Sequence, residues 1–132
     1  MRVYTYSEKE TKKFGKIIGA YMKQEGINIL ALYGEMGAGK TVITKGVAEA
    51  FGLNEKDIMS SSFIIVSSYP EQSFYHIDLY RVNDPEELDL WEYFESGVCV
   101  IEWAEKLKEL PERSLKLKIE LIDENTRLFV LD

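Results

Sequence analysis

The sequence has a single cysteine, Cys99, and three prolines among its 132 residues. One cysteine excludes an intramolecular disulfide and a metal site made of clustered cysteines. The longest nearly apolar run, residues 29–33, is far too short to cross a bilayer, and the first eight residues lack the apolar stretch of a signal peptide. We therefore expect a cytoplasmic protein with no membrane partner.

Basic residues are in the minority. Sixteen Lys and Arg stand against 23 Asp and Glu, which gives a formal net charge of −7. A surface of this sign does not attract the phosphate backbone of nucleic acids, so nucleic acid is expected to matter only through a partner. The 45% hydrophobic and 30% charged residues are typical of an ordinary globular protein, and the length predicts one domain over residues 1–132.

Hydrophobic periodicity predicts an α/β domain. Ser7 and Glu10 form the pattern of a capping box at the start of a helix that ends near Gly26. Further helices are expected over 40–51, from residue 84 onward and over 104–110, and strands over 27–33, 63–69, 73–80, 98–103, 115–122 and 127–131. Because two pairs of these strands are joined by short turns, the sheet should be mixed and partly antiparallel.

The strongest motif lies between the first predicted buried strand and the helix that follows it. Residues 34–41 match the pattern G-x-x-x-x-G-K-[ST] in full, and they are Gly34, Glu35, Met36, Gly37, Ala38, Gly39, Lys40 and Thr41. From the composition of this chain, the motif would arise somewhere by chance at roughly half a percent. A glycine-rich helix start without a ligand is the structural alternative. The strand before the motif and the helix after it favour a phosphate-binding loop.

Each residue type in this motif has a physical role in binding a triphosphate. The glycines allow successive N–H groups to turn inward, and the helix that begins at Lys40 adds its positive dipole end. The Lys40 ammonium would reach the β- and γ-phosphates, and the Thr41 hydroxyl would bind Mg²⁺. The motif thus predicts a site for ATP or ADP with Mg²⁺.

Two carboxylates at predicted strand ends are candidates for the metal and for catalysis. Glu102 follows four apolar residues, and Asp78 ends a second strand. A phosphate loop needs an acid for Mg²⁺ and usually one to orient water, and the pattern does not say which acid has which task. The only histidine, His76, lies on the same strand face as Asp78 and is a structural or a catalytic residue.

Four strings in this order resemble the bacterial TsaE family, the ATPases of threonylcarbamoyladenosine synthesis on tRNA. They are the phosphate loop, H-x-D-L-Y-R at 76–81, D-P-E-E-L at 84–88 and I-E-W at 101–103, and they extend over nearly the whole chain. The resemblance implies a three-layer P-loop NTPase-like domain with a mixed sheet. It also implies that Lys40 and Thr41 take their usual roles, that Glu102 is the magnesium-site acid and that Asp78 is a second essential acid.

The resemblance implies four further nucleotide contacts. Trp103 would flank the site, and Ser62 stands where the family has the threonine of a switch string. Here that string has lost its proline, which frees the backbone, but Ser62 keeps the hydroxyl. Glu8 and Arg127 correspond by position to the base pocket of the family.

The partner that the resemblance implies is the transferase heterodimer of TsaD–TsaB type, with tRNA reached only through that complex. The expected reaction is Mg²⁺-assisted attack of water on the γ-phosphate, with Lys40, Asp78 and Glu102 as catalytic residues. We expect slow hydrolysis in isolation, because the four arginines of the chain include no confident arginine finger. A non-hydrolytic nucleotide switch shares every residue named, and a small-molecule kinase is the other alternative.

Overall fold

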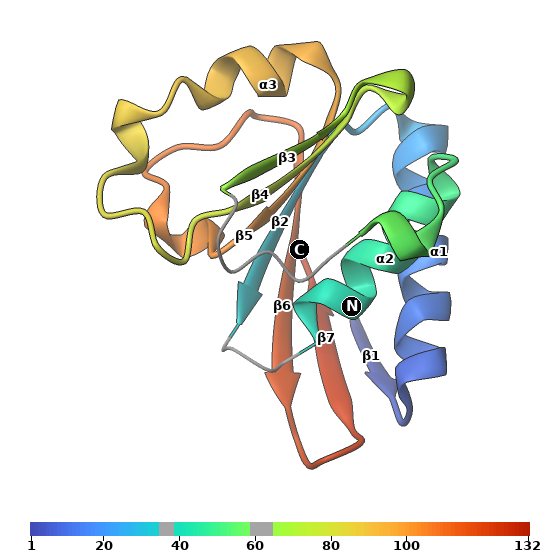
Figure 1. Cartoon of the computed structure of the whole chain (residues 1–132). Helices are drawn as coiled ribbons and strands as arrows, with labels where there is room; N and C mark the ends of the chain where they lie inside the picture. The colour runs from blue at the N-terminus through green and yellow to red at the C-terminus, as the bar shows by residue number, and fades with distance from the viewer. Residues whose placement is uncertain (35–38, 59–64) are drawn as a thin grey trace.

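The computed structural model describes residues 1–34, 39–58 and 65–132, and in this part of the chain seven strands form one mixed sheet (Figure 1). The helices are α1 (Glu8–Glu25), α2 (Lys40–Ala50) and α3 (Leu90–Ser96), and the strands are β1 (Arg2–Thr5), β2 (Ile29–Gly34), β3 (Val66–Tyr69), β4 (Phe74–Asp78), β5 (Val98–Glu102), β6 (Ser114–Leu121) and β7 (Arg127–Leu131). The predicted α/β class with a partly antiparallel sheet is confirmed.

The sheet has a parallel centre and antiparallel edges. Its strand order is β1-β7-β6-β2-β5-β4-β3. Strand β2 runs parallel to both β5 and β6, and β4 runs parallel to β5. The pairs β3–β4, β6–β7 and β1–β7 are antiparallel, so the two predicted hairpins are present. Parallel strands end at the same edge, and ligands of open α/β sheets bind beyond that edge.

Helices cover both faces of the sheet, which makes three layers (Figure 1). One core cluster joins α1 and α2 to the sheet through residues such as Phe14, Ile43 and Leu117. A second cluster joins α3 to the opposite face through Leu90, Phe94 and their neighbours. In β5 the side chains alternate between these clusters, so Val98 and Val100 face α2 while Cys99 and Ile101 face α3.

Helix α1 begins and ends as its sequence predicts. The Glu10 N–H donates to the Ser7 hydroxyl (3.1 Å) and the Tyr6 N–H donates to the Glu10 carboxylate (3.0 Å), so the capping box is formed. Gly26 ends the helix in the left-handed conformation at φ 67°. The contact with α2 is close, because a Cβ built on Gly46 would lie 2.2 Å from the Lys12 carbonyl oxygen. A larger residue at position 46 would push α2, the helix that follows the phosphate-loop motif, away from α1.

Three elements differ from the sequence prediction. Strand β1 was not predicted, because four residues at a sheet edge carry too little periodicity, and it forms only by pairing with β7. The helix expected from residue 84 is a 3₁₀ turn over Pro85–Glu87, and α3 starts later because Leu88 is extended (φ −87°, ψ 138°). The helix expected over 104–110 is only the 3₁₀ turn Ala104–Lys106.

No helix in the described ranges has the length and apolar character to cross a membrane.

Candidate functional site

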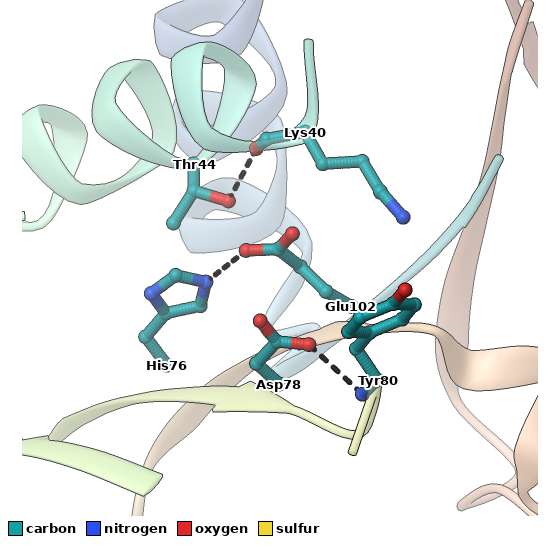
Figure 2. Close-up of polar contacts among 6 residues, drawn as sticks. All are labelled: Lys40, Thr44, His76, Asp78, Tyr80 and Glu102. Carbon is teal, nitrogen blue, oxygen red and sulfur yellow. Dashed lines mark hydrogen bonds and ion pairs between the residues drawn. The ribbon is translucent and has the colours of Figure 1, made fainter. Parts of the chain in front are cut away.

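Strands β2, β4 and β5 bring the predicted site residues to one edge of the sheet. The β4–β5 register places Asp78 opposite Glu102, and the β2–β5 register places Leu32 opposite Glu102. Helix α2 starts at the same edge, beyond the end of β2 at Gly34. The two acids that were separate candidates in the sequence are therefore direct neighbours below the start of α2 (Figure 2).

Lys40 is the buried cation of this site. Its side chain is 5% exposed, its ammonium donates to the Gly34 carbonyl oxygen (2.9 Å), and it lies 4.0 Å from the centre of the Trp103 ring. Burial lowers the pKa of the Lys40 ammonium, and the negative charges of Glu102, Glu105 and Asp78 oppose that change. A desolvated cation with weak neutral partners is suited to exchange them for phosphate oxygens.

Glu102 is held by His76. The Glu102 side chain is almost fully buried, and its Oε2 lies 2.5 Å from Nε2 of His76, which is 1% exposed (Figure 2). Nearby, the Thr44 hydroxyl donates to the Lys40 carbonyl oxygen (2.7 Å), so its hydrogen bond stays within α2 and does not go to Glu102. The sequence placed His76 on the face of Asp78, but the pairing with Glu102 across 26 residues had no signal in the pattern.

Asp78 is the second acid, and it has a separate anchor. Its Oδ1 accepts a hydrogen bond from the Tyr80 N–H (3.0 Å). Burial raises the pKa of the Asp78 carboxyl, the negative charge of Glu102 adds to this, and the Tyr80 N–H bond opposes it. Burial therefore outweighs the nearby Lys40 ammonium, which acts to lower this pKa, and the fold disfavours the ionised form of the Asp78 carboxyl.

This raised pKa predicts a stability gain for Asp78→Asn in the presence of EDTA. At pH 7 the folded state bears the cost of the ionised, partly buried carboxylate, whereas the amide is neutral and its oxygen still accepts from the Tyr80 N–H. We expect a higher Tm for the variant at pH 7. The difference should shrink toward pH 4, because Asp78 takes up a proton in the folded state as the pH falls through its raised pKa.

Circular dichroism melts at several pH values measure this effect, and Asp123→Asn is the control of opposite sign. Hydrogen bonds from Asn125 and Thr126 lower the pKa of the exposed Asp123 carboxyl. Its contribution to stability is present above its unfolded pKa, so Asp123→Asn should lower the Tm at pH 7. A lower Tm for Asp78→Asn at pH 7 would contradict the desolvation argument.

The described ends of the phosphate loop have the strained backbone that the motif requires. Gly34 has φ 153°, and a Cβ there would lie 2.6 Å from the Ile119 carbonyl oxygen. Gly39 has φ 102° and caps α2, and Thr41 lies half-buried in the first turn of that helix. Residues Glu35, Met36, Gly37 and Ala38, and the predicted switch residue Ser62, lie outside the described residues.

Trp103 and Tyr80 form one wall of the site. Their ring centres lie 5.0 Å apart, and Trp103 has a positive φ of 60° directly after β5. The resemblance implies that Trp103 flanks the site, and in the structure Trp103 is half-buried beside Lys40. Tyr80 was not singled out from the sequence, although its position two residues after Asp78 could have indicated it.

A small cavity brings Glu8 and Arg127 together at the start of α2. It has a volume of about 120 Å³ and is lined by Ser7, Glu8, Thr11, Gly39, Val42, Glu124, Asn125 and Arg127. The Arg127 guanidinium donates to the carbonyl oxygens of Asp123 (3.3 Å) and Glu124 (3.2 Å). These two residues are far apart in the sequence, and β7 and α1 place them beside the phosphate-loop residue Gly39.

Comparisons with known proteins show which family the chain is similar to. A family model described as "Threonylcarbamoyl adenosine biosynthesis protein TsaE" matches residues 5–129. The tRNA threonylcarbamoyladenosine biosynthesis protein TsaE of Bacillus subtilis (strain 168) is 38% identical over 128 residues, which cover 93% of this chain and 79% of that protein. The protein of the same name from Treponema pallidum (strain Nichols) is 32% identical over 133 residues, with 96% of each chain covered.

A solved structure is similar over almost the whole chain. It is described as the crystal structure of Bacillus subtilus YdiB, and it superimposes with a TM-score of 0.77 at 33% identity, covering 99% of this chain and 83% of that one. The mixed sheet, the phosphate-loop motif ahead of α2 and the family match over residues 5–129 lead to one conclusion: the chain belongs to the TsaE family, with the P-loop NTPase fold.

Proposed function

We propose that this protein is an ATPase that binds ATP with Mg²⁺ and hydrolyses it to support the synthesis of threonylcarbamoyladenosine on tRNA. Membership of the TsaE family supports the pathway. The convergence of Lys40, Asp78 and Glu102 at the parallel-strand edge, beside the start of α2, is the observation that supports the chemistry. It is the arrangement that phosphoryl transfer needs, with a cation for the phosphates and acids for the metal and for water.

The oxygen ligands at this edge fit Mg²⁺. This ion prefers oxygen ligands and is usually bound by one or two carboxylates together with substrate phosphates. Glu102 has Oε2 held by His76, and Asp78 has Oδ1 held by the Tyr80 N–H, which leaves Oε1 of Glu102 and Oδ2 of Asp78 as the atoms that would bind an ion. With the Thr41 hydroxyl, these atoms would hold an ion that neutralises phosphate charge when bound.

The residues of this chain then perform three tasks in hydrolysis. Lys40 moves from the Gly34 carbonyl oxygen to the β- and γ-phosphates and stabilises the charge that spreads over the phosphoryl oxygens. One of the two acids orients the attacking water. Trp103, whose ring contacts that of Tyr80, covers Lys40 from one side and reduces its exposure to water, which strengthens its interaction with the phosphates.

The partner in this proposal is the transferase heterodimer of TsaD–TsaB type, and tRNA is reached only through it. A chain of net charge −7 is a poor direct ligand for tRNA, because like charges repel. Docking on a protein complex avoids the electrostatic repulsion between this chain and tRNA. ATP hydrolysis by this chain would permit repeated turnover of the transferase rather than perform the modification itself.

Calorimetry and a turnover assay test the proposal. We expect the purified protein to bind ATP with Mg²⁺ in isothermal titration, and to hydrolyse ATP faster with the transferase heterodimer than alone. In the presence of that heterodimer, ATP should sustain many rounds of tRNA modification and a non-hydrolysable analogue should not. If the analogue sustains repeated rounds, the protein is a nucleotide switch, and absence of any ATP binding contradicts both functions.

Glu8 and Arg127, which line this cavity, are proposed to contact the base of the nucleotide. Arg127→Ala should then weaken ATP binding by about 10- to 150-fold, the equivalent of about 1.5–3 kcal/mol for a hydrogen bond to a charged group. Binding of inorganic tripolyphosphate should change little, because that ligand has no base. Titration calorimetry with both ligands measures the difference.

Arg113→Ala is the matched control for this variant. Arg113 also donates to a backbone carbonyl oxygen, that of Glu25 (2.8 Å), and Glu25 is the last residue of α1, at the opposite end from Glu8. Arg113→Ala should leave the affinity for both ATP and tripolyphosphate unchanged. Equal losses of ATP and tripolyphosphate affinity in Arg127→Ala would place Arg127 on the phosphates instead of the base.

A further inference from the structure

We propose that His76 is a positioning residue that orients Glu102 for the metal through a hydrogen bond from Nε2–H. This inference rests on the function proposed above and assigns a task to the only histidine of the chain. The juxtaposition that carries it is a fully buried imidazole 2.5 Å from one oxygen of a buried carboxylate at the nucleotide edge.

The register of the central strands makes this contact specific. His76 lies opposite Val100 and Asp78 lies opposite Glu102, so His76 and Glu102 form a diagonal pair on the face that also carries Asp78. Figure 2 shows Glu102 between His76 and Lys40, with its second oxygen pointing away from His76. A carboxylate fixed at one oxygen keeps the other oxygen in one place, which a metal ligand requires.

The surroundings indicate which nitrogen carries the proton. Nδ1 of His76 is buried and has no hydrogen-bond partner among the described residues, whereas Nε2 faces a carboxylate. A neutral imidazole has one donor and one acceptor nitrogen, and a buried N–H without a partner is rarer than a bare acceptor. In the neutral imidazole the proton therefore belongs on Nε2, and in the imidazolium both nitrogens carry one, so Nε2 donates to Glu102 Oε2 in either form.

The neighbouring donors Thr44, Tyr80 and Lys40 have other acceptors in the described part of the chain. The Thr44 hydroxyl donates to the Lys40 carbonyl oxygen, and the Tyr80 N–H donates to Asp78. Lys40 donates to the Gly34 carbonyl oxygen and reaches over Trp103. Each acid thus has its own anchor, His76 for Glu102 and the Tyr80 backbone for Asp78.

Nuclear magnetic resonance of the nucleotide-free protein in EDTA tests the contact directly. Because the chain has one histidine, a long-range ¹H–¹⁵N spectrum reports His76 alone. We expect a proton on Nε2, whether or not Nδ1 also carries one, and we expect the Nε2 signal to shift in Glu102→Gln. A spectrum with a proton on Nδ1 and none on Nε2 overturns the proposal.

The Mg²⁺ dependence of ATP binding tests whether His76 orients Glu102 for the metal. His76→Leu keeps an apolar side chain in the buried position but removes the donor, and we expect it to reduce the enhancement of ATP binding by Mg²⁺ about 10- to 100-fold, with ATP binding in EDTA unchanged. His76→Gln places an amide N–H near the position of Nε2 and should restore most of the enhancement. Cys99→Ala, a buried change in β5 on the opposite face, controls for general destabilisation.

The outcomes are decisive in each case. A native Mg²⁺ effect in His76→Leu, an equal loss of ATP binding with and without Mg²⁺, or a failure of His76→Gln to restore what His76→Leu loses overturns the proposal. If His76→Leu does not fold, the spectrum decides. If the native protein shows no Mg²⁺ effect on ATP binding, the proposed metal site fails, while the spectrum still decides whether His76 donates to Glu102.

Discussion

Lys40→Ala is expected to weaken the binding of ATP by roughly 30- to 1,000-fold. Loss of one partner from a buried, charge-assisted contact costs about 2–4 kcal/mol, and each 1.4 kcal/mol is a factor of ten in affinity. The loss should appear both with Mg²⁺ and in EDTA, because the ammonium acts on the phosphates directly. Isothermal titration with ATP and ADP measures it, and hydrolysis should fall with it.

The fluorescence of Trp103 offers a second measurement of ATP binding by Lys40. The Lys40 ammonium lies 4.0 Å from the centre of the Trp103 ring, so its departure toward the phosphates changes the charge beside the indole. We expect ATP to change the tryptophan fluorescence of the native protein and not that of Lys40→Ala. Lys118→Ala, which alters an exposed lysine of β6 with Glu120 as its ion-pair partner, should behave as the native protein does. Native ATP affinity in Lys40→Ala would exclude the phosphate loop as the binding site.

Glu102→Gln is expected to lower hydrolysis in the presence of the transferase partner by at least about 100-fold. Unlike Lys40→Ala, it should retain ATP binding in EDTA. Loss of a single preorganised interaction with a transition state costs about 10²- to 10³-fold in kcat. Binding without metal should be equal or tighter, because a negative charge beside Lys40 and the phosphates is removed. The amide oxygen can still accept from His76 Nε2–H, so the fold should be retained.

A steady-state assay together with titration calorimetry separates the two variants. Lys40→Ala should lose binding under both conditions, whereas Glu102→Gln should lose the Mg²⁺ enhancement and kcat. Glu105→Gln is the matched control, because Glu105 also lies near Lys40 but is exposed in the 3₁₀ turn after β5. Native hydrolysis by Glu102→Gln would assign the essential acid to another residue, with Asp78 as the next to test.

Much of the fold was predictable from local patterns. The capping box and Gly26 set the ends of α1, and the apolar runs of β2 and β5 marked buried strands, because these signals depend on residues close together in the chain. Prediction failed where the signal was short or where extended backbone competed with a helix. Strand β1 is stable only through β7, and Leu88 interrupts the helix that Asp84 and Pro85 appeared to begin.

In the candidate site, too, local patterns were predictable from the sequence and long-range contacts were not. By itself, the sequence determined which residue types are candidates at this edge: a glycine-rich motif with Lys40 and Thr41, and acids at predicted strand ends. Each of these signals depends on local spacing. Only the tertiary structure decided that Asp78 lies opposite Glu102, that His76 holds Glu102, and that Glu8 and Arg127 share one cavity. These contacts join residues 24 to 119 positions apart, and they depend on strand register and helix docking, which no local pattern specifies.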